Sequence, residues 1–230
     1  MDRVIIACDF PNEQALNTFL DTINQPNITL KIGMELFYKE GPELIEKLKD
    51  KGYKIFLDLK LHDIPNTVEK AMANLGTLGV DLVNVHAQGG IEMMKAAKRG
   101  LERVGAKTKL IAVTQLTSTN QQMLEEELSI HQPINKIIVK YALNTKAAGL
   151  DGVVCSPLEA PMVHEACGED FLTVTPGIRL SDGDSHDQKR IATPEAAKQL
   201  KTDYIVVGRS ITAANDPLKN YQRVKELFDA

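Results

Sequence analysis

Short apolar segments recur along the chain at regular intervals. They are rich in valine, isoleucine and leucine, and most are apolar at consecutive positions, which is typical of parallel strands covered on both faces. The pattern predicts strands over 3–8, 28–32, 54–59, 81–85, 109–113, 152–155, 171–174 and 204–207. Segments with helical periodicity lie between them, among them 42–51, 67–78, 91–104 and 194–200.

The spacing of these elements predicts the architecture. The first five predicted strands start about 25–28 residues apart, which accommodates one strand, one helix and two short loops. Eight such units in 230 residues predict an α/β fold, a (β/α)8 TIM barrel forming a single domain over 1–230. An open doubly wound sheet is the alternative, and the lack of GxGxxG after the first strand counts against it. In a barrel, the residues that follow the strands meet at one end, where active sites of this fold lie.

Composition and charge narrow the class of protein. The chain has 27 Lys and Arg against 31 Asp and Glu, so neither nucleic acid nor a membrane is expected as a partner. The three cysteines, Cys8, Cys155 and Cys167, form no CxxC pair, which excludes a zinc finger or a disulfide scaffold. They predict reduced thiols in a cytoplasmic protein. The apolar run near the N-terminus is too short for a signal peptide or a spanning helix.

The segment 56–67, FLDLKLHDIPNT, concentrates charge at the end of an apolar strand. On an extended backbone Asp58 and Lys60 share one face, so both are expected to point into the mouth of the barrel. Buried charges are costly unless they pair, and a salt-bridged strand end is the purely structural interpretation. A lysine flanked by carboxylates stays an ammonium at neutral pH, so Lys60 is the candidate general acid. Lys31, on the neighbouring strand, extends an alternating network of Lys and Asp.

Glycine and arginine follow the last two predicted strands, where this fold commonly builds a phosphate site. Gly208 and Arg209 come directly after the eighth strand, and PGIR follows the seventh. Glycine permits close backbone approach, and a guanidinium can bind phosphate oxygens through two parallel hydrogen bonds. A tight turn and a surface cation are the alternatives without a function.

The polar segment 179–190, RLSDGDSHDQKR, has no apolar periodicity. A loop of about a dozen residues in a compact domain is often an active-site lid, although a plain surface loop is the alternative. Arg179 and Gln188 are the members of this segment expected to reach an anion. Closure over a charged ligand would exclude water and strengthen the electrostatic interactions inside.

Other common chemistries find little support. The five histidines show neither HxH nor HxxxH spacing, and a lysine that would repel a cation separates Asp58 from Asp63, so no metal is expected. GxSxG is absent, and no cysteine has an evident nucleophile context, which leaves acyl transfer unsupported.

Taken together, these motifs resemble the orotidine 5′-phosphate decarboxylase family over essentially the whole chain. The resemblance is carried by Asp9 after the first strand, LKIG at the second, DLKLHDIPNT at the third, QLTS after the fifth, PGIR after the seventh and VVGRSIT at the eighth. Related 3-keto-gulonate-phosphate decarboxylases and hexulose-phosphate synthases share DxKxxD. They use magnesium and carry a glutamate where this chain has Lys31.

The resemblance implies cofactor-free decarboxylation of orotidine 5′-monophosphate to uridine 5′-monophosphate, the last step of de novo pyrimidine synthesis. It implies that Lys60 protonates C6 as carbon dioxide leaves, and that Asp58 lies against the departing carboxylate. It implies further that Lys31 and Asp63 complete the network, with Asp63 and Thr67 reaching the partner's site in a homodimer. The remaining implied contacts are Asp9 with the ribose, Thr117 with the pyrimidine, Gln188, Gly208 and Arg209 with the phosphate, and Arg179 at the lid.

Two other functions stay open at this stage. One is a magnesium-dependent sugar-phosphate decarboxylase or aldolase on the same barrel, which EDTA would inactivate. The other is a nucleotide-binding barrel without catalytic activity. The charges of Asp58, Lys60 and Asp63 argue against the second, because a binding module has no reason to hold them together.

Overall fold

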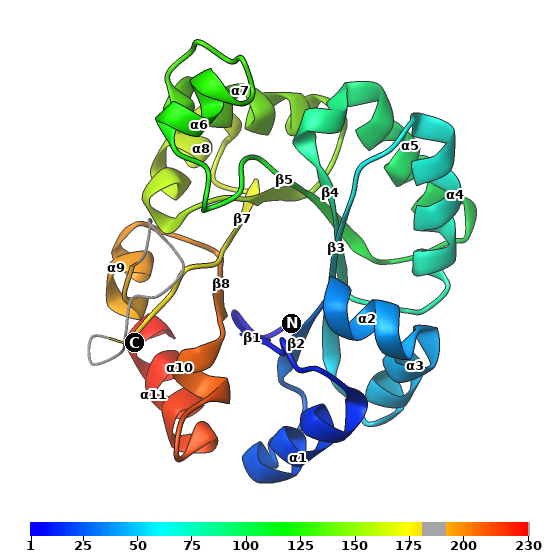
Figure 1. Ribbon diagram of the computed structural model, residues 1–230, viewed down its shortest axis with the longest axis vertical. Coiled ribbons are helices and arrows are strands. Elements are labelled where there is room, and N and C mark those ends of the chain that lie inside the picture. The colour runs from blue at the N-terminus through cyan, green and yellow to red at the C-terminus, as the bar shows by residue number, and fades with distance from the viewer. Residues whose placement is uncertain (181–191, 230) are drawn as a thin grey trace.

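The computed structural model describes residues 1–180 and 192–229, and its strands close into a barrel (Figure 1). Each strand runs parallel to the next, and β8 pairs with β1 to complete the ring. The eight strands in this part of the chain are β1 Val4–Ala7, β2 Thr29–Gly33, β3 Lys54–Leu61, β4 Leu82–His86, β5 Lys109–Val113, β6 Gly152–Val154, β7 Leu172–Thr175 and β8 Tyr204–Val207. The predicted (β/α)8 barrel is thus confirmed, with every strand end within two residues of its expected position, and the doubly wound alternative is wrong.

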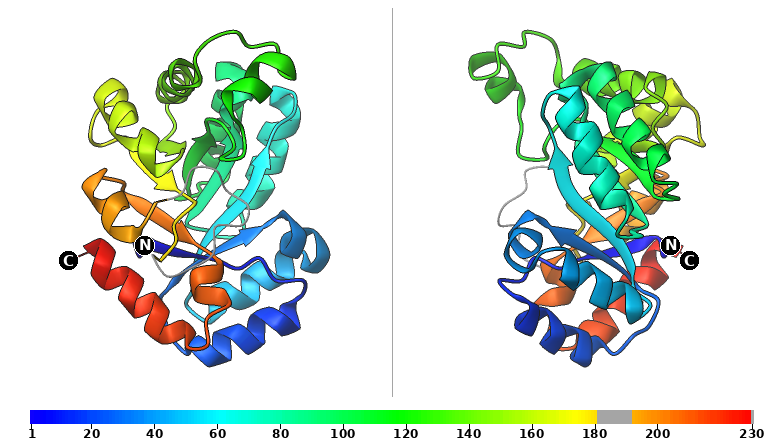
Figure 2. Two further views of the ribbon diagram at one scale, coloured as in Figure 1. Left: turned by 60° about the vertical axis from the view of Figure 1, so that its left-hand side comes forward. Right: turned by 90° about the vertical axis from the view of Figure 1, so that its right-hand side faces the viewer.

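Helices surround the barrel on its outside (Figures 1 and 2). They are α1 Glu13–Ile23, α2 Met34–Glu40, α3 Pro42–Asp50, α4 Pro65–Gly76, α5 Gly90–Arg103, α6 Gln121–Glu126, α7 Ile134–Ala147, α8 Ala160–Cys167, α9 Pro194–Gln199, α10 Arg209–Thr212 and α11 Pro217–Asp229, with 3-10 turns η1 Ala87–Gly89 and η2 Pro157–Glu159. Side-chain caps fix several starts: Asn12 and Asn120 each accept the N–H three residues on. The described part of the chain contains no helix long and apolar enough to cross a membrane.

Both faces of the strands are buried, because successive side chains point alternately into the barrel and outward toward the helices. The inward-facing side chains form a cluster inside the barrel, made of Ile5, Ala7, Phe56, Leu82, Ile111, Val174 and Val206. The residues between them pack outward beneath the helices in a larger cluster. This double burial explains the continuous apolar segments, and each large side chain removed from water contributes roughly 1.5–3 kcal/mol.

The ring closes where the two ends of the chain meet. β1 pairs with β8, and residues just before β1 contact the C-terminal helix α11. Asp2 accepts hydrogen bonds from Lys225 (2.7 Å) and from the Tyr221 hydroxyl (2.6 Å), both on α11. The guanidinium of Arg3 lies 4.5 Å from the centre of the Phe228 ring. The last helix is therefore fastened to the residues that lead into the first strand.

Strand β3 is irregular at its carboxyl end, which is the end that carries the charges. Leu57 pairs with Val83 and Leu61 with Val85, so three residues of β3 lie opposite a single residue of β4. Lys60, inside this bulge, has a φ of 51°, a left-handed conformation that disfavours residues with a Cβ by about 1–2 kcal/mol. The expectation of an extended backbone through Lys60 is wrong at this point, because the bulge rather than simple alternation directs its side chain.

Candidate active site

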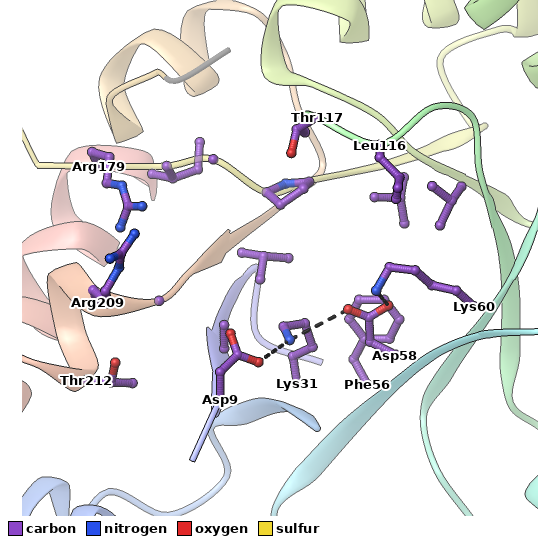
Figure 3. Close-up of a pocket in the computed structure, with 18 of the residues that line it drawn as sticks. Asp9, Lys31, Phe56, Asp58, Lys60, Leu116, Thr117, Arg179, Arg209 and Thr212 are labelled. Atoms are coloured by element: carbon purple, nitrogen blue, oxygen red, sulfur yellow. Dashed lines mark hydrogen bonds and ion pairs between the residues drawn. The ribbon is translucent and has the colours of Figure 1, made fainter. Parts of the chain in front are cut away.

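A pocket of ≈ 530 Å³ opens at the carboxyl ends of the strands (Figure 3). Its volume is typical of a site for a small ligand. Its apolar lining includes inward-facing strand residues, namely Ala7, Phe56, Val113, Val154 and Val206. Eight of the predicted site residues also line it: Asp9, Lys31, Asp58, Lys60, Thr117, Arg179, Gly208 and Arg209.

Four alternating charges run across one side of the pocket (Figure 3). Asp9 Oδ1 lies 2.8 Å from Lys31 Nζ, which is 3.6 Å from Asp58 Oδ2. The other oxygen of Asp58, Oδ1, lies 2.7 Å from Lys60 Nζ. β1, β2 and β3 are adjacent, so residues near their carboxyl ends meet. The expected Lys31–Asp58–Lys60 arrangement is present, and Asp9 extends it at one end.

Mutual pairing keeps Asp58 and Lys31 charged despite their burial. Burial raises the pKa of Asp58, but the positive charges of Lys31 and Lys60 lower it by a larger amount. The net pKa of Asp58 therefore lies below its ordinary value. Burial lowers the pKa of Lys31, but Asp58 and Asp9 raise it more, and the net pKa lies above its ordinary value. At neutral pH Asp58 is therefore a carboxylate and Lys31 an ammonium. Removal of one partner from such a buried pair costs about 3–5 kcal/mol.

The ammonium of Lys60 is the group best positioned for proton transfer. Its side chain is 25% exposed and reaches Asp58 from the bulge of β3. Figure 3 shows it entering the pocket from the side opposite Arg179 and Arg209. A fixed cation at this point can stabilise negative charge that develops on a bound ligand and can then donate a proton to it.

Two arginines form the other end of the pocket. Arg179 follows β7 and Arg209 begins α10, and Figure 3 shows their guanidinium groups turned toward each other. Within the described residues, Nε of Arg179 is buried without a hydrogen-bond partner. The backbone of Arg179 is held because its N–H donates to the carbonyl of Ala192 at 3.0 Å. Guanidinium groups facing one another favour an anion between them, and a phosphate fits this requirement.

Three predicted site residues are not part of this pocket as described. Gln188 lies outside the described residues, as does most of the predicted lid over 179–190. Asp63 and Thr67 are exposed at the start of α4, and over 1–180 and 192–229 the lining of the pocket includes neither. Asp63 Oδ1 accepts the N–H of Ile64 at 2.6 Å. Within a single chain, Asp63 is therefore not joined to the charge network.

One residue in contact with the network was missed by the sequence analysis. Asn84, in the middle of β4, is 1% exposed and donates a hydrogen bond from Nδ2 to Asp58 Oδ1 at 2.7 Å. Its own Oδ1 accepts the backbone N–H of Lys60 at 2.8 Å. A polar residue inside an apolar strand was the signal that would have pointed to it.

The donor set of the pocket suits an anion better than a divalent cation. In the part of the chain that the structure describes, no three His, Cys, Asp or Glu side chains are grouped as ligands for a metal. Both oxygens of Asp58 already face ammonium groups, which repel a second cation. The arginine pair therefore favours a ligand with an anionic group at that end, while the network presents two carboxylates and two lysines at the other end.

Fold and site together define a (β/α)8 barrel whose pocket has an arginine pair at one end and a charge network at the other. Residues 2–224 match the family described as "Orotidine 5'-phosphate decarboxylase / HUMPS family", and the chain belongs to this family. Two relatives named orotidine 5′-phosphate decarboxylase are similar to it along its length. The protein from Staphylococcus haemolyticus is 57% identical over 225 residues, covering 98% of this chain and 97% of the relative. That from Bacillus cytotoxicus is 54% identical over 230 residues, with the same two coverages.

Solved structures show the same fold. The crystal structure of orotidine 5′-phosphate decarboxylase from Lactobacillus acidophilus has a TM-score of 0.90 and 46% identity, and all of each chain is covered. A conserved protein from Geobacillus kaustophilus, described as uncharacterized, has a TM-score of 0.88 and 47% identity, covering 98% of this chain and 99% of its own. The resemblance noted from the motifs is thereby confirmed.

Proposed function

We propose that this protein decarboxylates orotidine 5′-monophosphate to uridine 5′-monophosphate and carbon dioxide, the last step of de novo pyrimidine synthesis. The observation that carries the proposal is the Lys31–Asp58–Lys60 charge network, which shares one pocket with the arginine pair Arg179 and Arg209. The substrate has matching features, a phosphate at one end and a carboxylate at the other. Relatives at 54–57% identity bear the name of this activity.

Lys60 carries the chemical step in this proposal. The bond between C6 and the carboxylate breaks, its electron pair stays on C6, and carbon dioxide leaves. The resulting vinyl carbanion has no π system to delocalise it, so it depends on a fixed ammonium nearby. Lys60 then transfers a proton to C6 and becomes a neutral amine, which solvent reprotonates. The interaction strengthens as charge moves from the carboxylate to carbon, and this difference lowers the barrier.

The other polar residues bind and orient the nucleotide. Gly208, Arg209 and Gln188 are proposed to hold the phosphate, with assistance from Arg179. Asp9 contacts the ribose and Thr117 the pyrimidine edge; the remaining catalytic groups are Lys31, Asp58 and Asp63. Support for these roles comes from the pocket, which is lined by all of the described residues named here except Asp63. Gln188 lies outside the described residues.

We infer that the protein acts as a homodimer in which Asp63 and Thr67 enter the pocket of the partner subunit. Both are exposed in the single chain, so both are available to a second copy. Ile64, between them, is 66% exposed, an unusual value for isoleucine. A dimer that buries this segment would remove apolar surface from water and would complete the charge network.

We also propose that residues 1–230 form one domain that acts in the cytoplasm. Cys8, Cys155 and Cys167 are free and buried, and their reduced state suits a reducing compartment. Asp2, just before the first strand, contacts Lys225 on the last helix, as expected of one folding unit.

The proposed activity is tested by following the loss of orotidine 5′-monophosphate absorbance in the presence of EDTA. We expect rapid, metal-independent loss with formation of uridine 5′-monophosphate, because Lys60 rather than a metal stabilises the developing charge. The controls, each offered with magnesium, are a 3-keto-gulonate phosphate for decarboxylation and a hexulose phosphate for aldol cleavage. Turnover of the sugar phosphate alone would replace the proposal by the magnesium-dependent alternative, and tight nucleotide binding without turnover would leave a binding protein.

A substrate without its phosphate is expected to lose both affinity and turnover. Contacts from charged groups contribute about 1.5–3 kcal/mol each, so kcat/KM for orotidine should fall by roughly 10²–10⁴-fold. Arg209→Ala should lower kcat/KM for the nucleotide and leave that for orotidine unchanged. Arg99→Ala, at a surface arginine paired with Glu69, is the matched control. Equal turnover of orotidine and its phosphate would show that the arginine pair binds something else.

A further inference from the structure

Asn84 occupies the single position on β4 that lies opposite the bulge of β3. Leu57 pairs with Val83 and Leu61 with Val85, so residues 58–60 face Asn84 alone. The regular ladder of backbone hydrogen bonds is interrupted over this stretch. A buried backbone N–H without a partner is costly, so the interruption needs a substitute acceptor.

The side chain of Asn84 supplies that acceptor and a donor as well. Its Oδ1 accepts the backbone N–H of Lys60 at 2.8 Å, and its Nδ2 donates to Asp58 Oδ1 at 2.7 Å. One amide therefore contacts both residues that hold the reacting charges. Its hydrogen bond to the Lys60 N–H helps to hold the left-handed backbone of Lys60, with its φ of 51°, where the ladder of backbone hydrogen bonds is interrupted.

The two oxygens of Asp58 have different partners, and this fixes the orientation of the carboxylate. Asp58 Oδ1 receives Asn84 Nδ2 and Lys60 Nζ, each at 2.7 Å, while Lys31 faces Oδ2 at 3.6 Å. With Asn84 in place, the carboxylate has a fixed rotation, and so has the ammonium bonded to it. Because Asn84 is 1% exposed, water cannot replace it readily.

An amide is the side chain of this size that fits. An aspartate keeps the acceptor for the Lys60 N–H but loses the donor, and its charge repels Asp58. An alanine loses both hydrogen bonds and leaves a cavity. The other titratable groups near this position are Lys31 on β2 and the pair His62 and His86, whose ring centres are 5.7 Å apart.

We propose that Asn84 is a positioning residue that aligns Lys60 and Asp58 for proton transfer. The inference rests on the proposed decarboxylation. The role is indirect, because Asn84 acts through the two residues that it holds and does not line the pocket as described. Its effect is therefore expected in kcat and to a much smaller degree in KM, since misplacement of a reacting group by about 1 Å can cost roughly 10²-fold.

Two variants test the proposal, each compared with wild type by steady-state kinetics and thermal unfolding. Asn84→Ala should lower kcat about 10- to 100-fold with KM nearly unchanged. Asn84→Asp should show a similar loss at neutral pH, and its kcat relative to wild type should rise several-fold as the pH falls toward 5. Two adjacent carboxyls share a proton at raised pKa, and a protonated Asp at position 84 regains the donor toward Asp58.

The control is Thr173→Val on β7, which removes a buried hydroxyl bonded to Asp203 at 2.9 Å. It should reduce stability without lowering kcat. Unchanged kcat in Asn84→Ala, or a deficit of Asn84→Asp that is the same at every pH, would reduce Asn84 to a packing role. If Asn84→Ala does not fold, the isosteric Asn84→Asp decides alone. An inactive wild type would overturn the proposed function, whereas an active wild type with unaffected variants would overturn this inference only.

Discussion

Replacement of Lys60 by alanine is expected to lower the rate of decarboxylation by roughly 10⁴-fold or more. General acid catalysis contributes about 10²–10⁴-fold, and loss of one fixed electrostatic group about 10²–10³-fold. Both contributions come from the same ammonium, 2.7 Å from Asp58 Oδ1. The measurement is the loss of orotidine 5′-monophosphate absorbance with EDTA present.

The Lys60→Ala variant should lose decarboxylation but keep nucleotide binding. The phosphate contacts proposed for Arg209 are unchanged by Lys60→Ala, so uridine 5′-monophosphate should still bind, as calorimetry can measure. Lys47→Ala is the matched control, because Lys47 is an exposed lysine paired with Glu13 at 3.0 Å. If the decarboxylation rate of Lys60→Ala were within tenfold of the wild-type rate, another group would have to be the proton donor.

Mixing two inactive variants is expected to restore activity. In a dimer with Asp63 in trans, Lys60→Ala and Asp63→Ala subunits together form one site with both groups intact. Random exchange of equal amounts gives half hybrid dimers, so about a quarter of all sites should regain wild-type activity. The measurement is specific activity after subunit exchange, relative to each variant alone.

The control for this experiment is a mixture of Lys60→Ala with Asp58→Asn. Both substitutions affect residues of the same pocket, 2.7 Å apart at their polar atoms. Their hybrids contain no intact site, so this mixture should stay inactive. If native mass spectrometry shows hybrid dimers of the first mixture but activity does not return, then Asp63 acts within its own chain or not at all.

The sequence predicted the barrel because its cause is local and repeated. Strands buried on both faces are expected to be apolar at consecutive positions, and most of the eight predicted strands showed this pattern. The ends of the strands were less well defined: the expected end at residue 59 extends to Leu61 in β3. A bulge depends on pairing with a strand some 25 residues away, which no local pattern of hydrophobic residues specifies.

The site was predictable where it depends on strand ends and not where it depends on cross-strand contacts. Asp58 and Lys31 could be brought together because neighbouring parallel strands place their carboxyl ends side by side. The sequence marks Asn84 only as a polar residue in an apolar strand, and its contacts could not be predicted because they come from the interrupted ladder beside it. Asp63 was assigned to the partner's site through family resemblance, and the pattern of residues alone offered no means of predicting this.

The division of the pocket between the first three strands and the last two has a consequence for the motions of the protein. The charge network comes from β1, β2 and β3, whereas the arginine pair follows β7 and β8. The seam where the ring is closed, β8 against β1, lies between these two groups. A ligand that contacts both ends thus bridges the seam and opposes its local opening. We expect hydrogen exchange along β1 and β8 to become slower in the complex, because the substrate then holds together the two strands that join the first and last parts of the chain.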